Sequence, residues 1–181
     1  MLGALRAATA GRHELLDSDL AIGRPDATIA DYRNHLLMLH AWLAPLEAWL
    51  AGYGDGPQDV SLLTGKPRLA MIAADLEADV GATVSAVSDT PAWPQDASAA
   101  YRWGVCYVIE GSQLGGAVLY QRLKEQLAPH RLAYLQGEAA GPGPRWRLFM
   151  QAIKAQVTTH DQIGQACKGA CDAFDRILAL R

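Results

Sequence analysis

Apolar side chains recur along this chain every three or four residues, the spacing that places them on one face of an α-helix. The alternation of apolar and polar residues that is typical of β-strands is not sustained anywhere. The pattern predicts helices over 2–18, 28–51, 66–82, 95–128 and 144–181, with the last segment in two pieces that meet near 158–161. We therefore expect an all-α protein.

The composition narrows the class of protein further. The chain has 181 residues, of which 50 % are hydrophobic and 19 % charged, which suits a single domain over 1–181 with a substantial core. The net charge is −3 and no run of Lys or Arg occurs, so we expect no nucleic-acid partner. No apolar run is long enough for a membrane span or a secretory signal. The three cysteines form no disulfide framework, which favours a cytoplasmic location.

Three glycines interrupt an otherwise helical pattern in "YVIEGSQLGGAVLY", residues 107–120. Each glycine inside a helix costs about 1 kcal/mol relative to alanine. Gly104, Gly111 and Gly115 lie close to one face of the predicted helix, and Gly116 lies beside that face. Such a face permits close packing of another helix, or a bend, or the close approach of a flat ligand to the backbone. The pattern alone does not choose among these.

A single histidine lies on the apolar face of the first predicted helix. His13 falls between Thr9 and Leu16 on that face, where a histidine is more often a hydrogen-bonded core residue than a ligand. Arg6 lies seven residues earlier, about 10 Å along the same face. An imidazole and a guanidinium in this arrangement suit a flat metal complex with an acidic rim. Haem is such a ligand, because imidazole binds its iron and cations pair with its propionates.

At these residues the sequence resembles the bacterial haem oxygenases. "LRAATAGRHELLD" resembles the motif of their proximal helix, and "YVIEGSQLGG" that of their distal helix. "YLQGEAAGPGPRWRLFMQAI" resembles the segment that follows in the family. The three matches occur in the family's order and extend over most of the chain. They are most similar to the group that supplies biliverdin to bacteriophytochromes.

The resemblance implies a helical bundle in which haem lies between the first, proximal helix and a glycine-bent distal helix. It implies oxidative cleavage of haem b to biliverdin, CO and ferrous iron, with O₂ and electrons from an external ferredoxin or flavin reductase. His13 would be the iron ligand. Gly111 and Gly115 would approach the haem closely, and Gly116 would support the bend. The chemistry itself belongs to the haem.

Other roles follow from the resemblance less directly. Ser112 stands where some family members carry an aspartate that holds distal water. Arg6 and, on the late helices, Lys168 are candidate partners of the propionates, and Phe174 is a candidate contact of the haem edge. Glu14 or Glu110 could orient the imidazole of His13. Glu110 should point away from the haem, because it is about 100° around the helix from Gly111.

Two other functions use the same residues. A haem carrier or sensor would keep His13 and the glycines without turnover. An unrelated helical interaction domain would make His13 a core residue. No flavin or nicotinamide fingerprint is present, so an oxygenase would need an external reductase, and a biliverdin-accepting protein such as a bacteriophytochrome is a further candidate partner.

Overall fold

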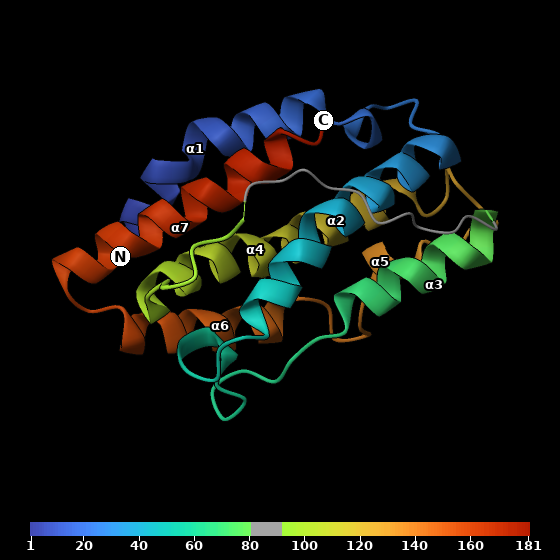
Figure 1. Cartoon of the computed structure of the whole chain (residues 1–181). Coiled ribbons are helices and arrows are strands. Elements are labelled where there is room, and N and C mark those ends of the chain that lie inside the picture. The colour runs from blue at the N-terminus through green and yellow to red at the C-terminus, as the bar shows by residue number, and fades with distance from the viewer. Residues whose placement is uncertain (81–91) are drawn as a thin grey trace.

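The computed structural model describes residues 1–80 and 92–181, and every regular element in them is a helix (Figure 1). No strand occurs among these residues, so the predicted all-α class is confirmed. The α-helices are α1 (Leu2–Asp19), α2 (Ile29–Leu50), α3 (Arg68–Val80), α4 (Ala99–Leu123), α5 (Ala133–Gln136), α6 (Gly143–Gln156) and α7 (His160–Leu178). Two short 3₁₀ helices, η1 (Ala21–Gly23) and η2 (Gly56–Gln58), follow α1 and α2.

The predicted helical segments correspond to α1, α2, α3, α4 and the pair α6 and α7. The last segment divides between Gln156 and His160, as its sequence predicts. Residues 81 and 82 of the third predicted helix lie outside the described residues. The pattern does not predict α5, because four residues are too few to show helical periodicity.

Two side-chain caps explain where α2 and α7 begin. The Thr28 hydroxyl accepts a hydrogen bond from the backbone N–H of Asp31, whose carboxylate accepts one from the N–H of Thr28. Thr159 and Gln162 form the same reciprocal pair at the start of α7. Each pair satisfies two backbone donors that a helix leaves unpaired at its first turn, which fixes the first residue of the helix.

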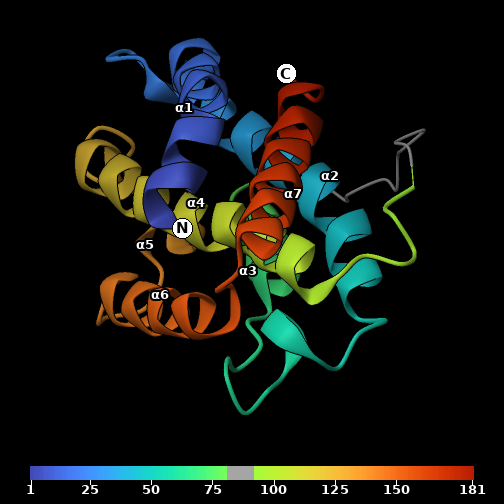
Figure 2. The same cartoon turned by 90° about the vertical axis from the view of Figure 1, so that its left-hand side faces the viewer.

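The central helix is α4, and the other helices surround it (Figure 2). Its most extensive packing is with α7, and α5 and α6 also lie against it. Helix α1 runs beside α7, on which it makes most of its contacts, while α2 packs on α3 (Figure 1). Helix α7 therefore lies between α1 and the first half of α4. Among the described residues, no helix combines the length and the apolar character that crossing a bilayer demands.

Two glycines allow α4 and α7 to approach each other closely. A Cβ atom on Gly104 would lie 1.8 Å from the carbonyl oxygen of Ala166, and one on Gly169 would lie 2.1 Å from that of Tyr101. Neither distance is compatible with a side chain. Close helix packing, one of the interpretations that the sequence left open, is therefore the role of Gly104.

The burial of α4 changes abruptly along its length. From Ala100 to Glu110 every residue except Tyr107 is buried. From Gly111 to Arg122 no residue is fully buried, and the side chain of Val118 is 62 % exposed. The change coincides with the start of the glycine stretch. The first half of α4 is thus a core helix, and the second half leaves one face open.

Candidate functional site

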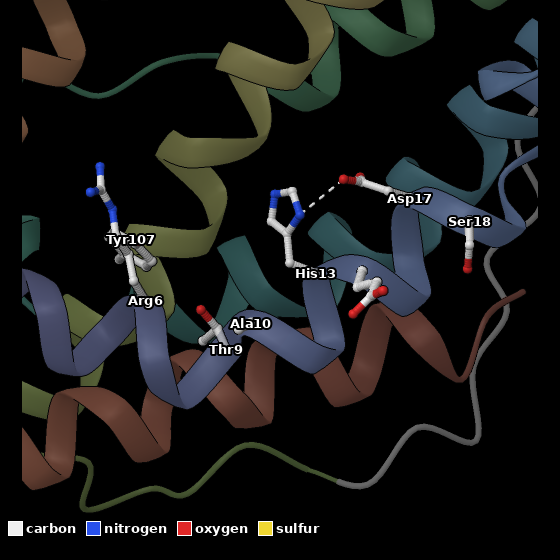
Figure 3. A pocket seen from close by; sticks show the side chains of 8 residues that line it. Arg6, Thr9, Ala10, His13, Asp17, Ser18 and Tyr107 are labelled. Carbon is white, nitrogen blue, oxygen red and sulfur yellow. Dashed lines mark ion pairs between the residues drawn. The ribbon is translucent and has the colours of Figure 1, made fainter.

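A cavity of about 660 Å³ lies along α1 and ends against α4 (Figure 3). Its volume is within the range of about 300–1,000 Å³ that is usual for small-molecule sites. Its lining comes from one exposed face of α1 and one aromatic residue of α4. The lining residues are Arg6, Thr9, Ala10, His13, Glu14, Asp17, Ser18 and Tyr107.

The α1 side of the cavity is a single helical stripe. Arg6, Ala10, His13 and Asp17 follow one another at steps of four, three and four, and all four are exposed. Figure 3 shows the side chains of Arg6 and His13 on the same side of α1. Thr9 lies at the base of the cavity, where it is buried and donates its hydroxyl hydrogen to the carbonyl of Leu5. The opposite face of α1 packs on α7, which leaves this stripe available to a ligand.

His13 is accessible and oriented. Its side chain is 64 % exposed, so the alternative of a buried core histidine is wrong for this structure. The Nδ1 atom lies 2.9 Å from Oδ2 of Asp17, one turn along the helix. Phe174 of α7 lies beside the imidazole, with 5.9 Å between the ring centroids. These contacts direct Nδ1 along the helix and leave Nε2 for a ligand.

The partner of the imidazole differs from the two that the sequence suggested. Neither Glu14 nor Glu110 is paired with His13, and Asp17 takes that position. Four residues separate His13 from Asp17, a spacing that places two side chains together on a helix. That spacing was a usable signal in the sequence. A carboxylate bonded to one ring nitrogen is the usual means of orienting a metal-binding histidine.

Arg6 and Tyr107 lie together at the other end of the cavity (Figure 3). Burial raises the pKa of the Tyr107 phenol, and the guanidinium of Arg6 partly offsets this effect. A guanidinium and a phenolic O–H are both hydrogen-bond donors to carboxylates. Sequence analysis missed Tyr107, although it lies four residues before Gly111 and so shares the face of the glycines.

Gly111 and Gly115 follow Tyr107 near one face of α4, beyond the residues that line the cavity. A Cβ atom on Gly111 would lie 3.9 Å from the ring of Trp146, which is ordinary contact. On Gly115 it would meet no atom within 4 Å, and Gly115 is exposed. Gly116 lies on another side of the helix, where a Cβ atom would be 3.6 Å from the side chain of Leu135. Of the three, Gly115 therefore has the most open space before it.

The cavity lining contains two of the predicted site residues, Arg6 and His13, and does not contain the other six: Gly111, Ser112, Gly115, Gly116, Lys168 and Phe174. The hydroxyl of Ser112 donates to the carbonyl of Ile109 within α4. The ammonium of Lys168 is 2.6 Å from Oδ2 of Asp172 and lies over the ring of Tyr101, 5.5 Å from its centroid. Phe174 is buried and contacts the imidazole rather than the open part of the cavity. The structure thus brings Arg6 and His13 together and places Lys168 elsewhere.

The chemistry of the cavity suits a metal complex better than a bare ion. In residues 1–80 and 92–181, no three His, Cys, Asp or Glu side chains are grouped closely enough to hold a metal ion. A macrocycle is one group that can supply the remaining ligands of a metal bound by His13. An accessible imidazole and, at the other end of the cavity, a pair of anion-binding donors together fit haem.

Comparison with known proteins agrees with this chemistry. The family model described as heme oxygenase matches residues 1–180. This chain belongs to the haem oxygenase family. A curated haem oxygenase of Xanthomonas campestris pv. campestris (strain 8004) is 31 % identical over 145 residues, which cover 78 % of this chain and 81 % of that protein.

The fold agrees with that of a structurally characterised haem oxygenase. The crystal structure of the NO- and CO-bound haem oxygenase from Neisseria meningitidis superposes with a TM-score of 0.74. The match covers 97 % of this chain and 87 % of that chain, at 21 % sequence identity. The predicted family and the predicted helical fold are thereby confirmed, and the roles of individual residues remain proposals.

Proposed function

We propose that this member of the haem oxygenase family binds haem b in the cavity between α1 and α4 and cleaves it to biliverdin, CO and ferrous iron. One observation carries the proposal: His13 is exposed, oriented by Asp17, and placed in a cavity of about 660 Å³. Bound haem supplies the activation of O₂ and is also the ring that is opened. The protein has to hold the ring, orient it and leave room for O₂.

His13 would bind the iron through Nε2. Asp17 accepts the hydrogen of Nδ1, which fixes the tautomer with its lone pair on Nε2 and makes the imidazole a stronger donor. Phe174 limits rotation of the imidazole ring from the α7 side. His13 and Phe174 lie on α1 and α7, which pack on each other. Nε2 of His13 would therefore have a fixed direction before haem binds.

The glycine face of α4 would cover the opposite side of the ring. Gly111 and Gly115 present backbone where other residues would present a side chain, and Gly115 has no atom before it within 4 Å. A small ligand such as O₂ could then reach the iron beside the helix. Ser112, bonded within α4, is proposed to contribute to holding distal water together with the backbone of this stretch.

Arg6 and Tyr107 would hold the propionates, because both donors lie at the same end of the cavity.

Replacing Arg6 with alanine should weaken hemin binding about tenfold, since a charged hydrogen bond contributes about that factor. Arg12→Ala is the matched control, because Arg12 lies on the other side of α1 and pairs with Asp175 at 2.7 Å. Hemin titration measures both. Equal weakening in the two variants would contradict the assignment.

The remaining participants are proposed from the family. Electrons would come from a separate ferredoxin or flavin reductase, and a bacteriophytochrome is a candidate acceptor of biliverdin. A cytoplasmic location and a single domain over 1–181 remain predictions.

The decisive experiment is a hemin titration of the purified protein, followed by ascorbate in air with catalase present. We expect a one-to-one complex with a histidine-ligated Soret band, which then decays as a broad red absorption of biliverdin develops. A stable complex without decay would indicate a carrier or sensor instead. The absence of a stoichiometric complex would overturn the proposed function.

A further inference from the structure

A buried carboxylate joins three helices directly behind the glycine stretch. Oε1 of Glu110 lies 2.6 Å from Nη2 of Arg68, on α3. Arg145, on α6, forms a bidentate pair of hydrogen bonds to the same carboxylate, and both N–O distances are 2.8 Å. Arg145 also donates to the carbonyl of Thr64 at 2.8 Å. Glu110 and Arg68 are only 6 % and 7 % exposed.

The charge of this group is well compensated. Burial raises the pKa of Glu110, but the guanidiniums of Arg145 and Arg68 lower it by more, so that the pKa lies below its usual range. Removing one member of such a buried set leaves uncompensated charge, which is strongly unfavourable. The contact therefore holds α3, α4 and α6 together at one residue of α4.

Glu110 lies next to the glycine stretch of α4. Glu110 immediately precedes Gly111, and it is rotated by about 100° from Gly111 and about 140° from Gly115. It therefore lies on the side of α4 that faces away from the open glycine face. It is also the last buried residue before the half-exposed part of the helix.

The two halves of α4 are supported differently. The first half is fixed by α7 through Gly104 and Gly169. In the second half, the amide of Gln113 donates to the hydroxyl of Tyr134 at 3.0 Å, Gly116 faces Leu135, and Arg122 near the end donates to the carbonyl of Gly23 at 2.6 Å. Glu110 is the charged anchor at the junction of the two halves.

We propose that Glu110 is a positioning residue, whose contacts with Arg68 and Arg145 fix the place at which α4 enters its glycine stretch and so set the distance of Gly111 and Gly115 from bound haem. The proposal rests on the proposed function, because it assigns the glycine face to haem. It differs from a general stabilising role in one respect. Loss of the carboxylate should loosen the second half of α4 while the first half keeps its contacts with α7.

The first test uses the haem-free protein. Glu110→Gln keeps the shape of the side chain and removes its charge. We expect amide hydrogen exchange over 111–120 to become more than tenfold faster, with little change over 100–109. Asp55→Asn is the control, because Asp55 contacts Arg102 of the same helix at 2.6 Å without touching the second half. Equal acceleration over both halves of α4 in Glu110→Gln would overturn the positioning role.

The second test uses the hemin complex. In Glu110→Gln we expect the histidine-ligated spectrum and the dissociation constant for hemin to change less than about threefold, because His13 lies on α1. The rate of ring opening should fall about tenfold or more, and the C–O stretching frequency of the ferrous CO complex should shift. Wild-type values for both the rate and the frequency would overturn the proposal.

Two further cases are failure of Glu110→Gln to fold and failure of the wild-type protein to bind hemin. If Glu110→Gln does not fold, Arg145→Gln replaces it, because that variant keeps the contact between Arg68 and Glu110. It should show the same pattern with smaller changes, and wild-type exchange over 111–120 would overturn the proposal. If the wild-type protein binds no hemin, the proposed function fails, whereas the exchange test on the haem-free protein still decides whether Glu110 positions α4.

Discussion

Replacing His13 with alanine should abolish the histidine-ligated spectrum of the hemin complex and reduce ring opening at least about a hundredfold. The reason is that His13 is the one imidazole lining the described cavity, and its Nδ1 is already bonded to Asp17. Without this imidazole, bound haem would lose the protein ligand that α1 offers. Absorption spectra with hemin and the yield of biliverdin under ascorbate measure the effect.

The control for this variant is His160→Ala, which removes an exposed imidazole at the start of α7. It should behave like the wild type. Added imidazole should restore the spectrum of His13→Ala in part, because it can occupy the space of the missing ring. A normal spectrum in His13→Ala would show that another residue binds the iron.

Replacing Gly115 with phenylalanine should block ligand binding on the α4 side of the ring and remove most of the biliverdin yield. Gly115 is exposed, and a Cβ atom on it would have no neighbouring atom within 4 Å, so the haem-free protein can accept the larger side chain. The bulk would then project toward the proposed haem site. The affinity of the ferrous complex for CO and the biliverdin yield are the two measurements, and wild-type values of both would contradict the placement of the distal face.

The matched comparison is between alanine at Gly115 and alanine at Gly104. Gly115→Ala should stabilise the haem-free protein by up to about 1 kcal/mol, because alanine favours the helix. Gly104→Ala should destabilise it by about 3 kcal/mol, because the methyl group would overlap the carbonyl of Ala166. Thermal unfolding without haem measures both. A gain in stability for Gly115→Ala and a loss for Gly104→Ala would show that the two glycines have different roles.

These two glycines also show how far the sequence could be interpreted. Periodicity places Gly104 and Gly115 near one face, but it does not say what lies against that face. In the structure α7 packs on the first part, whereas in the second part a Cβ atom on Gly115 would meet no atom within 4 Å. Close helix packing therefore applies to the first part of the stripe, and an open face suited to a flat ligand applies to the second.

The helices themselves were predictable because apolar spacing and the caps at Thr28 and Thr159 are local signals. The same holds for His13 and Arg6, which share one helical face. The contact between Glu110 and Arg145 was not predictable, because it joins residues 35 positions apart in the chain. The sequence suggests Lys168 as a partner of the haem, yet Asp172, one turn away, holds it outside the cavity.

The small residues on α7 have a consequence for substrate choice. Ala166, Gly169, Ala170 and Ala173 are buried on the helix that separates α1 from the first half of α4. Their size affects the distance between α1 and the first half of α4, although none of them lines the cavity. Gly169 accepts no side chain, so a chain engineered for a bulkier porphyrin would be altered at the three alanines, which act on the site from a distance.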